Sequence, residues 1–181
     1  MRIIAGSRKG SRIFAPKGTE TRPTGDRVRE AAFNLLGPDA AEGANVLDLF
    51  AGSGAMGLEA LSRGAASATF VESDRDACRT INRNLDKLEL GGAKVLCQDA
   101  LTALRNDVRS GRRYDLVLVD PPYRRFSSLQ NALIQYLPEV VEPGGLLIVE
   151  TSAKDEPELP LTRLKSRRYG SARLTLFERD E

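Results

Sequence analysis

Four consecutive residues, Asp120-Pro121-Pro122-Tyr123, carry the groups in this sequence that are best suited to hold an aromatic amine. They follow an apolar run, Leu116–Val119, that is typical of a buried strand in a parallel sheet. Open α/β sheets bind ligands beyond the carboxyl ends of their strands, so we expect these residues to face an active-site crevice. The Asp120 carboxylate and the Pro121 carbonyl oxygen can accept the two hydrogens of an amino group, and the Tyr123 ring offers a flat surface for a base. The plainer alternative is a strand-ending turn, because Asp and Pro are both common in turns.

A glycine-rich segment follows an earlier apolar strand, Val46–Phe50, and has the spacing G-x-G-x-x-G at Gly52, Gly54 and Gly57. Glycines let the backbone turn sharply and approach a ligand closely. Glu72, at the end of the next apolar run, is placed to accept hydrogen bonds from ribose hydroxyls. These features suit S-adenosylmethionine (AdoMet), but they also suit a dinucleotide such as NAD.

Two further carboxylates favour AdoMet over NAD. Asp48 lies four residues before Gly52, where it can hold a cationic amino group directly or through water but would repel a pyrophosphate. Asp99 follows the third expected strand and can accept a hydrogen bond from an adenine amine. The tetrapeptide at Asp120 also has no evident role in hydride transfer. Asp48 and Asp99 keep a plainer alternative role, as helix caps or loop acids.

The spacing of apolar residues predicts alternating strands and helices from Asn45 onward. Strands are expected at 45–49, 68–72, 93–97, 115–119 and 145–150, and helices at about 54–63, 75–88, 99–108 and 127–136. This α/β pattern predicts a mostly parallel sheet with helices on both faces. Two more strands, at 161–168 and 172–178, are separated by a short turn and predict an antiparallel end to the sheet. A β-hairpin (2–6 and 12–16) and a helix (about 25–36) are expected before the first parallel strand.

Composition restricts the class of protein. The 181 residues predict one domain, residues 24–181, preceded by a small extension, residues 1–23. The absence of histidine excludes a Ser-His-Asp triad, Cys-His catalysis and histidine-ligated metals, so no metal is expected. No apolar run approaches the ~20 residues of a membrane span, and no signal-peptide pattern is seen, so a cytoplasmic protein without a membrane partner is expected. In that compartment Cys78 and Cys97 are expected to be separate reduced thiols.

The net charge of +2 conceals a basic N-terminal segment, because residues 1–30 contain eight Lys or Arg and three Asp or Glu. Such a segment indicates a polyanionic partner, although a solvated charged surface is the plainer alternative. Arg8, Lys9 and Arg12, near the turn of the expected hairpin, are the candidates for RNA contact. Arg124 and Arg125 adjoin Tyr123 and extend the basic surface toward the expected crevice.

The residues from Arg2 to Gly10 and from Thr21 to Asn34, together with the glycine-rich segment and the tetrapeptide, resemble one known family. This is the bacterial 16S rRNA guanine-N2 methyltransferase family (RsmD), whose members are Rossmann-like class I AdoMet-dependent methyltransferases. The resemblance spans nearly the whole chain. It implies methylation of the 2-amino group of one guanine in 16S rRNA, within the 30S particle or an assembly intermediate. We expect a monomer, because a large RNA partner already supplies the contacts.

The resemblance also implies a role for each candidate residue. AdoMet would be held at its methionine end by Asp48 and the Gly52-Ser53-Gly54 turn, at its ribose by Glu72 and at its adenine by Asp99 and Ala100. The segment containing Arg22 and Thr24 would cover the amino-acid end of the cofactor, and the basic hairpin would bind RNA. Asp120 and the Pro121 carbonyl would orient the guanine amine, with Pro122 completing the turn and Tyr123 stacking on the base.

Three other functions stay open. An adenine-N6 DNA methyltransferase also uses this tetrapeptide, but it usually needs a target-recognition region, and only about forty residues precede the sheet here. A protein-amine methyltransferase usually carries Asn at the place of Asp120. An RNA-binding assembly factor without catalysis would use the sheet only as a docking scaffold.

Overall fold

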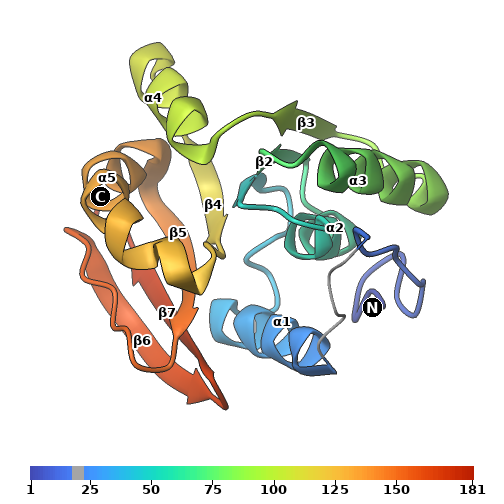
Figure 1. Cartoon of the computed structure of the whole chain (residues 1–181), viewed down its shortest axis with the longest axis horizontal. Helices are drawn as coiled ribbons and strands as arrows, with labels where there is room; N and C mark the ends of the chain where they lie inside the picture. Colours follow the sequence, from blue (N-terminus) through green and yellow to red (C-terminus); the bar gives the residue numbers. More distant parts are fainter. Residues whose placement is uncertain (18–22) are drawn as a thin grey trace.

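A seven-stranded sheet lies at the centre of the molecule, in the strand order β3-β2-β1-β4-β5-β7-β6. The structure is a computed structural model that describes residues 1–17 and 23–181, with the side chains of Pro23 and Thr24 outside the described part. The sheet and its helices are shown in Figure 1. The strands are β1 (Asn45–Leu49), β2 (Ser67–Glu72), β3 (Ala93–Cys97), β4 (Tyr114–Val119), β5 (Val141–Ser152), β6 (Thr162–Tyr169) and β7 (Ala172–Glu178).

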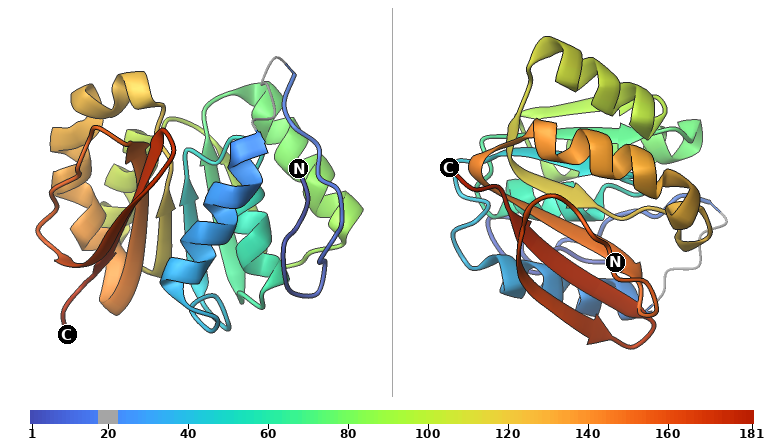
Figure 2. Two further views of the ribbon diagram at one scale, coloured as in Figure 1. Left: turned by 90° about the horizontal axis from the view of Figure 1, so that it is seen from below. Right: turned by 90° about the vertical axis from the view of Figure 1, so that its left-hand side faces the viewer.

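Helices cover both faces of this sheet, as the left view of Figure 2 shows. The helices are α1 (Pro23–Leu36), α2 (Ala55–Ser62), α3 (Arg75–Leu88), α4 (Ala100–Ser110) and α5 (Phe126–Val140), with a short 3₁₀ turn η1 (Tyr123–Arg125). Side chains alternate along β4, so Leu116 and Leu118 pack with α1, α2 and α3 in one core. Val117 and Val119 pack with α4 and α5 in the other core. The two cores fix the carboxyl ends of the strands along one edge of the sheet.

The C-terminal part of the sheet is antiparallel. Strand β7 pairs in the antiparallel sense with β5 on one side and with β6 on the other. Strand β6 therefore runs in the same direction as β5, and the turn between β6 and β7 lies at the carboxyl edge of the parallel strands. The expected fold class, a mostly parallel seven-stranded Rossmann-like sheet with an antiparallel C-terminal end, is confirmed.

The N-terminal hairpin forms, but not as two regular strands. Within residues 1–17 it has a single bridge, between Arg2 and Arg12. Three backbone hydrogen bonds join its arms: Ile3 N–H to Ser11 O (2.9 Å), Gly10 N–H to Ile3 O (2.8 Å) and Ile13 N–H to Met1 O (3.1 Å). The pairing expected between residues 2–6 and 12–16 is thus limited to one bridge, because side chains of the main domain take the place of a partner strand. The N–H groups of Ile4 and Ala5, for example, donate to the Glu59 carboxylate at 2.9 Å each.

Glu59 joins three segments at one buried point. Its side chain is fully buried in α2, where it accepts from Arg63 Nε at 3.0 Å as well as from the hairpin. Arg29 of α1, only 3% exposed, brings its Nε to 3.5 Å from the same carboxylate and donates from Nη2 to the Arg2 carbonyl. A buried carboxylate is tolerated only when it is paired and hydrogen-bonded in this way. The hairpin is thus attached to the helix that begins at the glycine-rich loop.

Cys78 and Cys97 are not separate thiols. The structure joins them as a disulfide between the first turn of α3 and the end of β3, with a Cα–Cα distance of 5.9 Å. This distance is ordinary for a disulfide. The sequence expectation was wrong because it considered the compartment alone, whereas the packing of α3 against β2 and β3 brings the two residues together.

No helix in the described part of the chain is long and apolar enough to cross a bilayer. The same residues contain no group of three or more His, Cys, Asp or Glu side chains arranged to hold a metal ion.

Candidate active site

A large cleft lies at the carboxyl edge of the sheet and has a volume of about 760 Å³. It brings together segments that are far apart in the sequence, namely the glycine-rich loop, the ends of β2, β4 and β5, and the start of α4. Most of the candidate residues line it, including Gly52, Ser53, Glu72, Asp99, Ala100, Asp120, Pro121, Pro122, Tyr123, Arg124 and Arg125. A cleft of this size is within the range typical of small-molecule and cofactor sites.

The glycine-rich loop forms the floor of the cleft through backbone conformations that side chains seldom adopt. Gly52 (φ 56°) and Gly54 (φ 80°) are left-handed, and Phe50 takes the same region at φ 61°. A non-glycine residue there is uncommon and often marks a functional segment. Gly57 is required for a different reason, since a Cβ at this position would lie 2.4 Å from the Phe70 ring. The expected tight approach of loop, helix and sheet is therefore present.

Asp48 lies beneath this loop rather than in the wall of the cleft. It is 2% exposed, and its Oδ2 accepts a hydrogen bond of 2.9 Å from the Gly57 N–H. The pKa of the Asp48 carboxyl is raised to about 7, mainly by burial; the Gly57 hydrogen bond lowers it in part, and the nearby Glu72 charge adds a smaller increase. The residue that the sequence assigned to the methionine end of the cofactor thus directly holds the turn from loop to α2.

The raised pKa of Asp48 predicts an unusual pH dependence of stability. Because the folded protein holds this proton between about pH 4 and pH 7 while the unfolded chain does not, stability falls as pH rises through that window. Asp48→Asn keeps an oxygen for the Gly57 N–H but has no charge to bury. We expect its free energy of unfolding at pH 8 to exceed that of the wild type by on the order of a few kcal/mol, with little difference at pH 4. Urea unfolding at both pH values measures this, and a destabilised Asp48→Asn at pH 8 would contradict it.

Glu72 and Asp99 combine a structural role with a place in the cleft. One Glu72 oxygen accepts the Gly52 N–H at 2.8 Å and the other accepts the Asp74 N–H at 2.9 Å, so Glu72 fixes the loop. Asp99 caps α4, accepting the Thr102 N–H at 3.1 Å on Oδ2. The alternative of a helix cap is therefore correct for Asp99, yet its side chain is exposed and still lines the cleft. A carboxylate has about four acceptor positions, so capping leaves room for a ligand.

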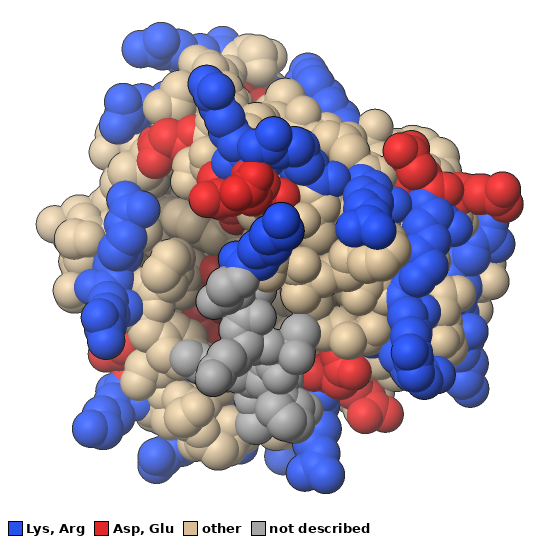
Figure 3. Space-filling view, turned by 45° about the vertical axis from the view of Figure 1, so that its right-hand side comes forward, with Lys and Arg blue, Asp and Glu red and all other residues tan. Residues whose placement is uncertain are grey.

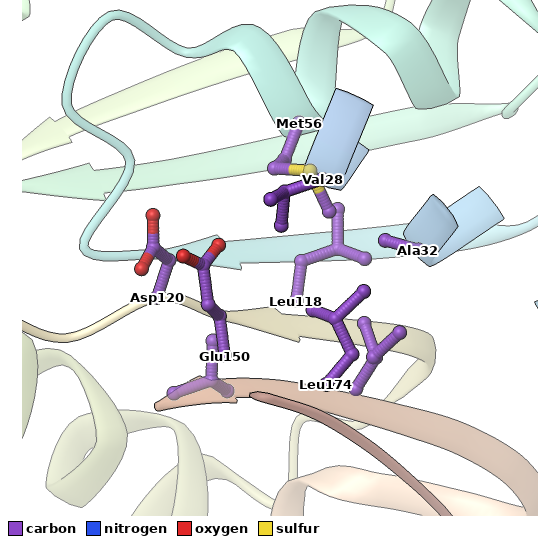
Figure 4. Close-up of a pocket in the computed structure, with 9 residues that line it drawn as sticks. Val28, Ala32, Met56, Leu118, Asp120, Glu150 and Leu174 are labelled. Carbon is purple, nitrogen blue, oxygen red and sulfur yellow. The ribbon is translucent and has the colours of Figure 1, made fainter. Parts of the chain in front are cut away.

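The Asp120-Pro121-Pro122-Tyr123 segment leaves β4 and turns into η1 along one wall of the cleft. The Asp120 N–H donates to the Leu49 carbonyl (3.4 Å), which anchors the segment to β1. Asp120 itself is exposed, whereas Pro121 is buried. Tyr123 donates its hydroxyl to Glu150 Oε1 at 2.7 Å, which fixes the orientation of the ring. Figure 4 shows the Asp120 and Glu150 side chains extending in the same direction from neighbouring strands.

The candidate RNA-contacting residues lie on two surfaces. Lys9 and Arg12 are exposed on the N-terminal hairpin, while Arg124 and Arg125 are exposed at the rim of the cleft. Figure 3 shows Lys and Arg side chains spread over one face of the molecule, with Asp and Glu side chains among them. Arg8 is engaged differently, since its guanidinium donates to the carbonyls of Leu88 and Glu89 at the end of α3. A cation at this position also interacts favourably with the helix dipole.

Two candidates cannot be placed, and one group was missed. Arg22 and the Thr24 side chain lie outside the described residues. Glu150 was not predicted as a cleft residue from the sequence, and neither were the exposed basic residues of the edge strand β6, Lys165, Arg167 and Arg168. An acid directly after the apolar run Leu147–Val149 repeats the pattern at Asp120 and was the available signal for Glu150.

Comparison with known proteins shows that this chain matches one protein family over nearly its whole length. The family model described as conserved hypothetical protein 95 matches residues 1–178. Ribosomal RNA small subunit methyltransferase D of Escherichia coli K12 is 40% identical over 88% of this chain and 75% of its own length. The protein of the same name from Haemophilus influenzae is 36% identical over 98% of this chain and 93% of its own length.

The solved structures agree with these sequence matches. The hypothetical protein TTHA0928 of Thermus thermophilus superposes with a TM-score of 0.82 at 33% identity, covering 100% of this chain and 99% of its own. The similarity therefore includes the N-terminal hairpin and the antiparallel end of the sheet.

Proposed function

This chain belongs to the conserved hypothetical protein 95 family, together with the ribosomal RNA small subunit methyltransferase D proteins, and from that premise we propose its reaction. It transfers a methyl group from AdoMet to the exocyclic 2-amino group of a guanine in 16S rRNA, within the small ribosomal subunit or an assembly intermediate. The observation that carries the proposal is the Asp120-Pro121-Pro122-Tyr123 segment in the wall of the cleft that the glycine-rich loop also lines.

The residues present fit AdoMet. The floor of the cleft offers the backbone of Gly52 and Ser53, and the carboxylates of Glu72 and Asp99 lie along one side for the ribose and the adenine. A carboxylate beside a helix start disfavours a pyrophosphate, because the like charges repel. Asp48 acts from beneath the loop by fixing the Gly57 N–H, so its part in binding is positioning of the backbone. When bound, AdoMet supplies a methyl group attached to a positively charged sulfur.

The residues of the wall prepare the amine for attack. The nitrogen of a guanine 2-amino group is a poor nucleophile, because its lone pair is conjugated with the ring. The Asp120 carboxylate and the Pro121 carbonyl accept its two hydrogens and draw the nitrogen toward a tetrahedral geometry that frees the lone pair. Tyr123, held by Glu150, stacks on the base and fixes its plane. Alignment and electrostatic complementarity then supply most of the acceleration, and the proton released after transfer passes to Asp120 or to water.

Methylation of small-subunit RNA tests this proposal directly. Purified protein is incubated with AdoMet carrying a labelled methyl group and with 30S particles that lack the modification, and duplex DNA serves as the competing substrate. We expect N2-methylguanosine at one nucleotide of 16S rRNA, identified by mass analysis of nucleosides and by mapping. N6-methyladenine in the DNA, or an absence of methyl transfer to the particles, would contradict the proposal.

The hairpin is proposed to contact RNA through Lys9 and Arg12, which are exposed, whereas Arg8 is held at the end of α3. The double change Lys9→Ala and Arg12→Ala is expected to weaken binding of 30S particles. It should also reduce the slope of log affinity against log salt by about 1–2, since each phosphate contact contributes about 0.7–0.9. Filter binding between about 50 and 200 mM salt measures the slope.

A matched pair on another surface provides the control for this experiment. Arg105 and Arg109 are exposed on α4, so Arg105→Ala with Arg109→Ala removes the same charge from an element that does not carry the hairpin. An equal change of slope in both double variants would show that the hairpin has no special role in RNA binding.

A further inference from the structure

Glu150 occupies the position next to Asp120 across two paired strands. Val119, the last residue of β4, and Val149 of β5 are Cα partners in a parallel pair; Asp120 directly follows β4, and Glu150 is the next residue of β5. Both side chains line the large cleft. Figure 4 shows both carboxylates directed to the same side, at one end of an apolar cavity that is also lined by residues such as Leu118, Ile148 and Leu174. Two acidic groups thus stand side by side where the substrate base must enter.

The Glu150 carboxylate is held in place by the wall of the site. Its Oε1 accepts the Tyr123 hydroxyl at 2.7 Å, which ties it to the ring proposed to stack on the base. Glu150 itself is only partly exposed, so its mobility is limited by β5 and by Tyr123. An ionised carboxylate has about four acceptor positions, so a bond from a phenol does not saturate it.

The Watson–Crick edge of guanine matches this arrangement. Two hydrogens on N2 and one on N1 point from the same edge, and the N1–H is adjacent to the amino group. If Asp120 and the Pro121 carbonyl take the two amino hydrogens, a third acceptor is needed beside them. Adenine presents a lone pair at N1 instead, which a carboxylate would repel, so the third acceptor decides between the two purines.

We infer that Glu150 selects guanine by accepting its N1–H, while Asp120 and the Pro121 carbonyl orient the amine. This inference rests on the proposed function and deepens it. The Asp120-Pro121-Pro122-Tyr123 tetrapeptide occurs in enzymes that methylate adenine and in enzymes that methylate guanine, so it does not by itself determine the base. In this chain the specificity comes from the neighbouring strand.

A base analogue tests whether Glu150 recognises the N1–H of guanine or supports the reaction irrespective of the base. In 2-aminopurine the 2-amino group is kept, but N1 is an acceptor without a hydrogen and O6 is replaced by hydrogen, so the change of preference between the wild type and Glu150→Gln is the quantity that reports on N1. Single-turnover rates are measured on 30S particles reconstituted with guanine or 2-aminopurine at the nucleotide mapped as above. The wild type should prefer guanine by about 10- to 100-fold, because the analogue loses a hydrogen bond to a charged group. Glu150→Gln can turn its amide N–H₂ toward N1, so its preference should fall to within about threefold.

Tyr123→Phe is the matched control. It removes the bond to Glu150 but leaves the carboxylate, so it should lower the rate on both particles and keep the preference for guanine. If Tyr123→Phe loses the preference to the same extent as Glu150→Gln, Glu150 acts only through Tyr123 and the inference is wrong. A wild-type preference retained in Glu150→Gln would also overturn it.

Two measurements separate this inference from the proposed function and from misfolding. If the wild type fails to methylate the guanine particles, the proposed function itself fails. AdoMet affinity, measured by calorimetry on each variant, should equal that of the wild type. Loss of AdoMet binding in Glu150→Gln would assign the side chain to the cofactor and overturn the inference.

Discussion

Replacing Asp120 by alanine is expected to lower the rate of methyl transfer by about 10²–10³-fold while AdoMet affinity stays within about threefold of the wild type. The reason is that Asp120 is proposed to face the base, whereas the cofactor is proposed to be held by the glycine-rich loop, Glu72 and Asp99, which line the same cleft. In the proposed mechanism, the change removes an acceptor that orients the amine and the first acceptor for its proton. Single-turnover transfer to 30S particles gives the rate, and calorimetry gives the AdoMet affinity.

Two further variants sharpen this prediction. Asp120→Asn keeps one acceptor oxygen but has no charge, so its rate should lie between those of the wild type and the alanine variant. Asp39→Ala is the control, because Asp39 is exposed in the loop that leads into β1, at the opposite edge of the sheet. Near-normal turnover of Asp120→Ala would remove Asp120 from the mechanism.

Glu59→Ala is expected to destabilise the protein by about 3–5 kcal/mol, which is a large fraction of a typical folding free energy. The change leaves the buried Arg29 guanidinium with Asp26 as its remaining carboxylate partner and deprives the N–H groups of Ile4 and Ala5 of their acceptor. Urea unfolding measures the free energy. Hydrogen exchange should show faster exchange at the amides of Ile4 and Ala5, because the hairpin loses its attachment to α2.

The expected destabilisation comes from the loss of the buried contacts of Glu59, so the loss of an exposed glutamate should not reproduce it. Glu139→Ala, at an exposed position of α5, should change stability by less than about 0.5 kcal/mol. Glu59→Gln keeps an acceptor oxygen without charge and should give an intermediate value. A loss of less than about 1 kcal/mol in Glu59→Ala would show that the buried charges are compensated elsewhere.

The elements of the sheet were predictable because their signals are local. The apolar run Leu116–Val119 gives β4, and the short turn at Gly170 separates β6 from β7, as the sequence indicates. The relation between Asp120 and the glycine-rich loop was predictable for the same reason, since parallel strands of an open sheet end at one edge.

Other features depend on contacts between distant segments and had no local signal. The pairing of Cys78 with Cys97 follows from the way α3 packs against the sheet. Glu59 lies among the small and apolar residues of α2, where the sequence shows an acid but not the hairpin amides that it accepts from. Arg8 is a basic residue near the hairpin turn, as expected of an RNA contact. Its guanidinium nevertheless donates a hydrogen bond to a carbonyl at the end of α3.

The insertion of β7 between β5 and β6 has a consequence for the order of assembly during synthesis. Strand β6 leaves the ribosome before its neighbour in the sheet exists, because every bridge that β6 forms with the described strands goes to β7. The backbone N–H and C=O groups on this edge of β5 likewise stay unpaired until residues 172–178 emerge. A nascent chain arrested before those residues would therefore present an open, aggregation-prone edge beside the cleft that is proposed to admit RNA.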